Sequence, residues 1–213
     1  MKFFCTTILI FCAMLITGCS LIDSPKTAFE EIQTALNQRD SKKFYERVDT
    51  QKLFAQIYEE STIQLAKDCE VYAKKYPKDP YFQNDGEFIK NYNAEHHDLH
   101  LDFAQKSLDA YFENLPAPEE PKDNPHAYVA GEFEKLHLVS TAEVEDEKIS
   151  GDTATLTVKV QGDNSLRGMF VGLITFKLGF QNVNGKWKLT SIENVEELTP
   201  TFVDKAELIW INL

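Results

Sequence analysis

Apolar residues in the first half of the chain recur three and four positions apart, which is the spacing of one helix face. Phe29, Ile32 and Leu36 follow this spacing and predict an amphipathic helix over residues 25–38. The preceding Ser24-Pro25 pair supports this start, because serine is a favoured N-cap and proline loses no hydrogen bond in the first helical turn.

The same spacing predicts three further helices. The first is short, and the other two are long and span residues 51–76 and 86–115. Pro77 and Pro80 end the first of these long helices, because proline cannot continue a helix. Residues 116–125 combine prolines with acidic side chains, which predicts an extended Pro-rich loop. The N-cap candidates of the three helices, in order, are Asp40, Asp49 or Thr50, and Asp85.

Past the Pro-rich loop the apolar period changes to two, which is the period of a strand with one buried face. Residues 153–160 alternate most regularly, with alanine, leucine and valine on one face and threonine and lysine on the other. A longer strand is predicted over 169–181, and Asn184-Gly185 predicts a tight hairpin into a strand over 187–192. The first strand is predicted from the alternation of Leu136, Leu138, Ala142 and Val144.

This order of elements predicts an α+β fold, with N-terminal helices packed on a curved antiparallel sheet of about four strands. Residues 24–213 are predicted to form a single domain, in which residues 51–115 are a helical insertion followed by the Pro-rich loop. The tail over 199–213 fits either a helix or a strand, and it is too short and too charged to span a membrane.

The first twenty residues have the pattern of an export signal rather than of a globular element. Lys2 provides a positive charge, and an uncharged apolar run extends from Phe3 to Ile16. This run is short for a membrane span, and it ends at small residues. The tetrapeptide Ile16-Thr17-Gly18-Cys19 is similar to the lipobox of bacterial lipoprotein precursors.

The lipobox resemblance implies that residues 1–18 are a signal peptide and that Cys19 carries the fatty acyl chains, palmitate among them. Residues 19–23 are then a short spacer, and several acyl chains anchor a protein stably where one is marginal. Ser20 is not the aspartate that retains lipoproteins in the inner membrane of many diderm bacteria, so we expect the outer membrane for a diderm source. An ordinary secretory peptide and a retained membrane helix are the alternatives.

The charge and the cysteines limit the classes of partner and of covalent bond. A formal charge of −12 repels phosphate backbones and anionic headgroups, so no nucleic acid partner is expected and the lipid must supply membrane attachment. Cys69 is the one cysteine left after signal removal and acylation, so no intramolecular disulfide is expected. It shares a helical stripe with Leu65 and Tyr72, where a small buried side chain is typical, and a reactive thiol is the alternative.

Two stretches resemble the nuclear transport factor 2-like, or cystatin-like, fold as it occurs in small bacterial lipoproteins. One runs from Ser24-Pro25 through the turn at Arg39-Asp40 to Val48, and the other is the hairpin from Asn184 to Leu189. The resemblance implies a sheet that curls around helices into a cone with an apolar cavity, and the inserted helices depart from it. It implies no single activity, because that fold serves hydrolases, isomerases, small-molecule binders and partner-binding scaffolds.

A histidine-rich stretch in the second long helix is the first candidate for chemistry. His96 and His100 are four residues apart and face the same way on a helix, a spacing that suits a metal. No glutamate stands between them in the zincin arrangement, and His96 falls on an apolar stripe with Tyr92 and Leu99. A histidine pair hydrogen-bonded to nearby carboxylates is therefore the favoured interpretation, and we predict no metal and no cofactor.

A second candidate is His137, which the alternation places outward from the first strand. With Asp102 or Asp98 it could form an acid–base pair that faces the cavity of a cone. No nucleophile elbow and no phosphate-binding loop is present, so no catalytic residue is assigned. The candidate polar residues of a pocket are His96, His100, His137 and Asp102.

These patterns together predict a lipid-anchored protein of the bacterial cell envelope that binds a small apolar ligand or a protein partner without catalysis. An isomerase-type or hydrolase-type enzyme that uses a histidine and a carboxylate in a pocket is one alternative. A structural envelope protein that docks its partners on the added helices is the other.

Overall fold

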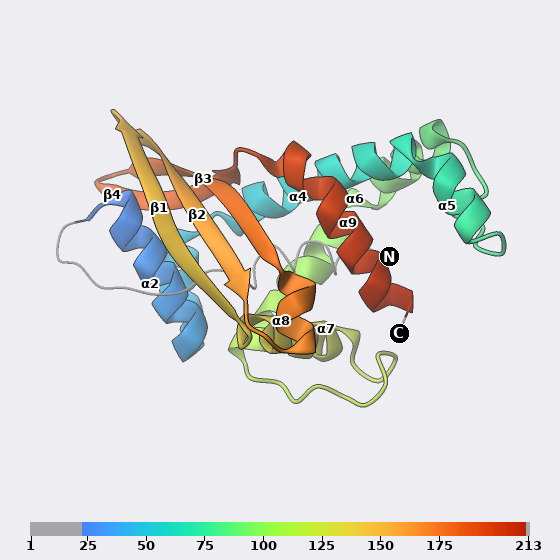
Figure 1. Ribbon diagram of the computed structural model, residues 1–213, viewed down its shortest axis with the longest axis horizontal. Coiled ribbons are helices and arrows are strands. Elements are labelled where there is room, and N and C mark those ends of the chain that lie inside the picture. Colours follow the sequence, from blue (N-terminus) through green and yellow to red (C-terminus); the bar gives the residue numbers. More distant parts are fainter. Residues whose placement is uncertain (1–22, 212–213) are drawn as a thin grey trace.

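The computed structural model describes residues 23–211, and the side chains of residues 23–206. The predicted signal peptide, Cys19 and Ser20 lie outside the described residues. Within the described part of the chain, helices precede and follow a four-stranded antiparallel sheet, which confirms the predicted α+β class (Figure 1).

The first two helices begin and end close to where the sequence predicts. Helix α2 spans Pro25–Gln38, and the Ser24 hydroxyl accepts a hydrogen bond of 3.1 Å from the Thr27 amide. Arg39 then takes a left-handed conformation with φ 55°, which ends α2. Helix α3 spans Ser41–Arg47 and is capped by the predicted Asp40. These short-range signals are therefore sufficient to define the helix pair.

Residues 51–115, which were predicted to be a helical insertion, contain three helices where two were predicted. Helix α4 spans Thr50–Lys67 and helix α5 spans Cys69–Lys75, with the break at Asp68, so the single predicted helix over 51–76 is wrong. Asp68 accepts no side-chain cap bond from α5, and no glycine or proline marks the break in the sequence. Helix α6 spans Gly86–Phe112 and packs against α4.

The main error of the sequence prediction lies after the Pro-rich loop. Helix α7 spans Pro125–His137, where a strand was expected to begin near Leu136. The Asn124 side chain caps the helix by accepting a 3.1 Å hydrogen bond from the Ala127 amide, and the helix buries Phe133 against Tyr111. Leu136 is buried from this helix, whereas Leu138 just after its end is 74 % exposed, so the two residues do not share one strand face.

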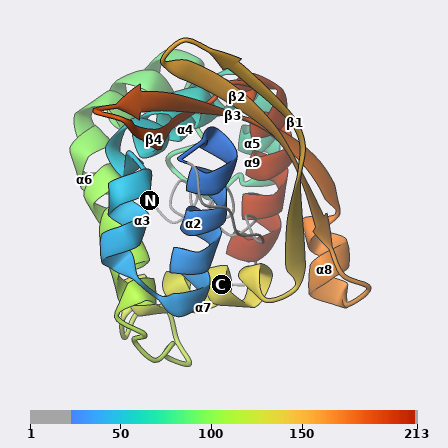
Figure 2. The ribbon, with the colours of Figure 1, turned by 90° about the vertical axis from the view of Figure 1, so that its left-hand side faces the viewer.

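The sheet is a meander of neighbouring antiparallel strands in the order β1-β2-β3-β4. Strand β1 spans Ser140–Ser150, β2 spans Thr153–Gly162, β3 spans Leu173–Val183 and β4 spans Lys186–Ile192. On β2 the even-numbered residues from Ala154 to Val160 are buried, as the alternation predicts. Figure 2 shows the sheet curved over α2, with its edges open.

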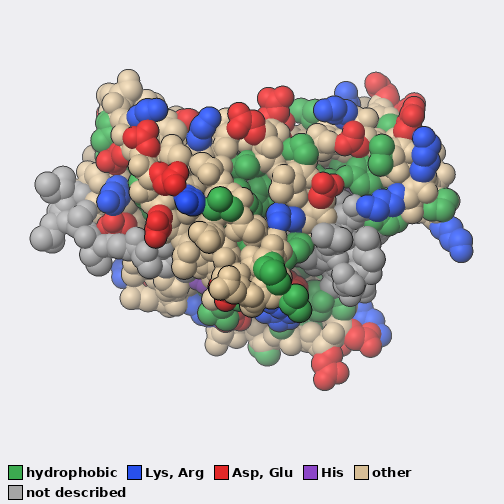
Figure 3. Space-filling model, viewed as in Figure 1, with side chains coloured by type: hydrophobic (Ala, Val, Ile, Leu, Met, Phe, Trp, Pro, Cys, Tyr) green, Lys and Arg blue, Asp and Glu red, His purple; other side chains and the backbone are tan. Residues whose placement is uncertain are grey.

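The connection between β2 and β3 is a short helix rather than the start of a strand. The third strand was predicted to begin at Met169, whereas helix α8 spans Leu166–Val171 and β3 begins only after Gly172. Gly172 has φ 68°, a conformation that glycine adopts without strain. Helix α8 leaves Leu166 and Met169 exposed, and hydrophobic side chains gather over it in Figure 3.

The C-terminal tail forms a helix, α9, which spans Val195–Ile211 and contains Pro200. The apolar positions Phe202 and Ala206, which fitted a helix in the sequence, are fully buried. Phe202 packs against Phe176 of β3, and this contact ties α9 to the sheet. Within residues 23–211, no helix has the length and hydropathy needed to cross a membrane.

The buried hydrophobic residues of all these elements join into one core. Between α2, α3, α4 and the strands β3 and β4, the remaining space measures only about 30 Å³ and has apolar walls. That volume is close to the space of a single water molecule. Side chains therefore fill this part of the interior, where the family resemblance implies a cavity.

Candidate functional site

An open cleft lies where the N-terminal helices meet α6 and the last strand. Its volume is about 760 Å³, and residues of α3, α4, α6 and β4 line it. A main-chain bridge between Val48 and Leu189, with a 2.9 Å hydrogen bond from the Asp49 amide to the Leu189 carbonyl, fixes the start of α4 against β4. The cleft therefore has a rigid wall on that side.

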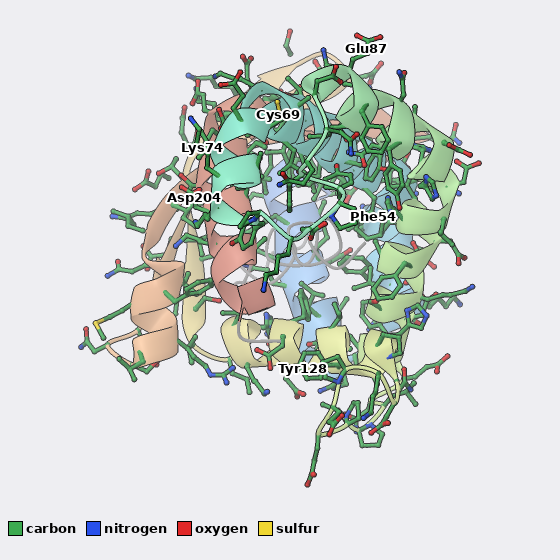
Figure 4. All side chains as sticks on the ribbon, turned by 90° about the vertical axis from the view of Figure 1, so that its right-hand side faces the viewer. Phe54, Cys69, Lys74, Glu87, Tyr128 and Asp204 are labelled. Carbon is green, nitrogen blue, oxygen red and sulfur yellow. The ribbon has the colours of Figure 1, made fainter. Side chains whose placement is uncertain are left out.

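The floor of the cleft is apolar and well packed. Phe54 from α4 and Val48 are buried there, and Leu101 from α6 is half-buried beside them. Figure 4 shows Phe54 on the α6 side of the molecule. A floor of this kind offers hydrophobic contact to a ligand without a deep cavity.

A chain of hydrogen bonds crosses one wall of the cleft. The Thr50 hydroxyl donates to Gln105 Oε1 at 2.9 Å, and Gln105 Nε2 donates to the Tyr45 hydroxyl at 2.8 Å. Tyr45 donates in turn to the Asp109 carboxylate. These polar groups use one another as partners, which holds α3, α4 and α6 in a fixed arrangement.

The rim of the cleft is mainly acidic. Asp49, Asp98 and Asp102 line it, and Lys188 from β4 is the basic residue among the lining side chains. The Asp102 carboxylate forms an ion pair of 2.6 Å with Lys106, one turn further along α6. The Asp49 carboxylate likewise lies 3.4 Å from the Lys52 ammonium group, so Asp98 is the rim carboxylate left to meet a positively charged ligand.

One histidine faces this cleft, and it is not one of the candidates that the sequence predicted. His97 lines the cleft, and its Nδ1 lies 2.8 Å from Oδ1 of the fully exposed Asp98. The ring edge of His97 also packs on Tyr58. The spacing His97, Leu101 and Gln105 is a helical i, i+4 series, and this series is the signal that could have located the cleft face of α6.

His100, a predicted pocket residue, is instead buried between α4 and α6, with 1 % of its surface exposed. The Tyr58 hydroxyl donates to the Asn93 carbonyl at 2.7 Å, and His100 Nδ1 lies 2.8 Å from the same hydroxyl. Because a tyrosine has one hydroxyl proton, His100 Nδ1 is the protonated nitrogen and donates to Tyr58. Burial lowers the pKa of His100 to about 4, so the ring is neutral at pH 7.

The neighbouring His96 contacts Tyr92 on its own helix rather than forming a metal site with His100. Its Nδ1 donates to the Tyr92 carbonyl at 2.8 Å, and its ring stacks on the Tyr92 ring at 4.1 Å between centroids. The His96 and His100 rings lie 6.1 Å apart. Among the described side chains, no three histidines, cysteines, aspartates or glutamates come together as metal ligands.

His137 lies away from the cleft, so the proposed pairing with Asp98 or Asp102 is not formed. It is the last residue of α7 rather than a strand residue, and it is 3 % exposed. Its Nε2 donates to Asn37 Oδ1 at 3.1 Å, and its ring stacks on Phe133. Of the four predicted pocket residues, the structure therefore places only Asp102 at the cleft.

Comparisons of the chain with protein-family models, with curated proteins and with solved structures give no match. The geometry of the site is thus the basis for the functional proposal. What the cleft offers chemically is an apolar floor, an acidic rim and a rigid hydrogen-bonded wall.

Proposed function

We propose that the protein is an envelope lipoprotein, held at the membrane by acyl chains on Cys19, which binds a segment of another protein in this cleft without catalysis. The observation that carries the proposal is the open cleft of about 760 Å³, compared with about 30 Å³ of space between α2, α3, α4 and the sheet. A cleft of about 760 Å³ accommodates a ligand. A space of about 30 Å³ is too small for an apolar ligand, which needs several hundred Å³. The nuclear transport factor 2-like resemblance remains part of this proposal, and the curved sheet over α2 supports it.

The chemistry of the cleft specifies the kind of segment that fits. An apolar side chain of the partner contacts Phe54 and Leu101, and a lysine or arginine beside it meets the acidic rim. The hydrogen-bonding groups of the wall already have partners, so contact with the floor and the rim supplies the affinity.

The binding proposal is tested in cells with a photo-crosslinking amino acid at Gln51, an exposed residue that lines the cleft. We expect an adduct of defined mass that is lost when Leu101 is replaced by Asp, because a charge on the floor opposes apolar contact. The matched control is Leu99→Asp, since Leu99 lies on the same helix and is 53 % exposed. An adduct that survives Leu101→Asp in a folded protein, or the lack of any adduct, contradicts the proposal.

The anchor has its own test, because Cys19 lies outside the described residues. We expect Cys19→Ala to abolish palmitate uptake and to release the protein from the membrane fraction. Unchanged fractionation together with unchanged palmitate uptake contradicts the lipid anchor. For a diderm source we propose the outer membrane, on the basis of Ser20.

A second candidate function rests on the His97–Asp98 pair in the cleft. A histidine with a carboxylate at 2.8 Å has the geometry of an acid–base pair, as in an isomerase or a hydrolase. The exposed carboxylate and the open cleft leave this pair in contact with water, which weakens it as catalytic machinery. His97→Gln distinguishes the two candidates, because it abolishes an enzymatic turnover but leaves the Gln51 adduct intact.

A further inference from the structure

The polypeptide enters the fold at a point that the structure fixes firmly. Asp23 Oδ2 accepts a hydrogen bond of 3.2 Å from the Trp187 amide at the start of β4, and Asp23 Oδ1 forms an ion pair of 2.8 Å with Arg47. Arg47 is 9 % exposed, and it also pairs with Glu31 at 2.6 Å. The last residue of the predicted spacer is therefore attached to the sheet and to α3.

Both hairpins of the sheet point to this same end of the molecule. The Lys26 amide donates to Glu147 near the turn between β1 and β2, and the Asn182 amide donates to the Asp152 carbonyl, which joins that turn to the end of β3. We call this the hairpin end; it comprises Asp23 and the turns 150–153 and 183–186. It is one end of the long axis in Figure 1 and faces the viewer in Figure 2.

The hairpin end carries apolar side chains in exposed positions. Ile149 beside the first turn is 55 % exposed, and Val183 beside the second is 50 % exposed. Lys148 and Lys186 flank them, with side chains 80 % and 63 % exposed, and each also lies near a carboxylate. Apolar residues with flanking lysines suit a membrane interface, because the lysine stem contacts the apolar region while the ammonium group reaches the headgroups.

The length of the spacer limits how far the hairpin end can lie from the bilayer. Three residues lie between Cys19 and Asp23, and the four residue steps of this extended chain span at most about 14 Å. Because Asp23 is fixed to β4 and α3, the part of the hairpin end around Asp23 is held within this distance of the acyl chains.

We propose that the hairpin end is the membrane-facing surface of the protein, with Ile149 and Val183 in contact with the headgroup region of the bilayer. This inference rests on the proposed acylation of Cys19. The occupant of the surface is lipid rather than a second protein, because the spacer leaves no room for a protein layer between Asp23 and the membrane.

The orientation has a consequence for the opposite end of the long axis. Helix α5 and the adjoining ends of α4 and α6 form that end, and Lys74 and Glu87 lie at its periphery (Figures 1 and 4). With the hairpin end on the bilayer, this helical arm extends away from the membrane.

The test uses the processed, acylated protein in vesicles of phosphatidylethanolamine and phosphatidylglycerol that contain a headgroup spin label. In a Cys69→Ser background, an environment-sensitive fluorophore is attached at Val183→Cys or at Val71→Cys. The positions match, since both are valines and Val71 on α5 is 61 % exposed, but they lie at opposite ends of the molecule. We expect several-fold stronger quenching at position 183 than at position 71.

Insertion of about ten Gly-Ser residues after Leu21 provides a second measurement, because it lengthens the tether by a root-mean-square reach of roughly 17 Å. The inserted spacer is expected to weaken quenching at position 183. Equal quenching at the two positions, or no effect of the longer spacer, overturns the orientation while the anchor stands. Absence of palmitate on Cys19 overturns both the anchor and the orientation.

Discussion

His100 shows how burial decides the chemistry of a side chain. The ring lies between α4 and α6 as a neutral hydrogen-bond donor to Tyr58, and Asn93 continues the network with a 3.1 Å hydrogen bond from the Tyr81 hydroxyl. Histidine spacing in the sequence gives no information on this burial. A histidine pair that suits a metal by spacing therefore acts here as a contact between two helices.

The lowered pKa of His100 predicts a loss of stability in mild acid. Its pKa is about 4 in the folded protein and about 6.5 in the unfolded chain, so the unfolded state gains a proton first as the pH falls from 6.5 to 4. The His100 contribution is complete above pH 6.5, and about 2 kcal/mol of it is lost at pH 5. Urea unfolding at pH 7 and pH 5 measures this difference.

The control for this prediction removes the titrating ring and keeps a hydrogen-bonding side chain. In His100→Gln we expect a lower free energy of unfolding at pH 7 and a smaller decrease between pH 7 and pH 5. His97→Gln, which changes a histidine at the surface cleft, should retain the wild-type decrease. If all three proteins lose the same free energy, His100 is not the source of the pH dependence.

At the scale of the secondary-structure elements, the start of α6 approaches the backbone of α4 closely at Gly86. A Cβ atom placed on Gly86 would lie 2.5 Å from the Ala66 carbonyl oxygen, and a backbone oxygen within a helix cannot move aside easily. Gly86→Ala is expected to reduce the free energy of unfolding by about 1–3 kcal/mol, as overpacking does elsewhere. The measurement is urea unfolding, with Lys90→Ala on the exposed face of α6 as the control.

The control variant should change the free energy of unfolding by less than about 0.5 kcal/mol, because its side chain is exposed. A Gly86→Ala protein as stable as the control would show that α4 and α6 can separate at little cost.

Elements with strong local signals could be predicted from the sequence, and those defined by tertiary packing could not. Ser24, Asp40 and Asp85 each cap the helix that was predicted to follow them, and the Asn184-Gly185 turn joins β3 to β4. Helix α7 was missed although Asn124 and Pro125 start it with the same kind of signal. Its apolar positions lead directly into β1, so the alternation of the strand was extended backwards into the helix.

The candidate site was predictable only in part, for a related reason. The apolar stripe of α6 was assigned to Tyr92, His96 and Leu99, whereas the buried residues of this part of α6 are Ile89, Asn93, His100 and Ala104. A shift of one position along a helix turns its face by about 100°, which exchanges His97 for His96 at the cleft. Polar residues such as Asn93 and His100 are buried because each finds a partner, and partners on other helices cannot be read from the sequence.

At the scale of the whole molecule, noncovalent packing carries the stability. Cys69, the one cysteine of residues 23–211, is a free thiol that packs half-buried against the core (Figure 4). Urea unfolding of the processed protein should therefore give the same midpoint with and without dithiothreitol. A midpoint that falls in reductant would point to a disulfide and would contradict this account.

The filled interior between α2, α3, α4 and the sheet also bears on the response to hydrostatic pressure. Pressure unfolds proteins largely because unfolding eliminates internal voids, and the volume change scales with the size of those voids. The space enclosed by these elements is about 30 Å³, while the larger cleft is open and contains solvent in either state. Compression therefore gains little from opening this part of the fold.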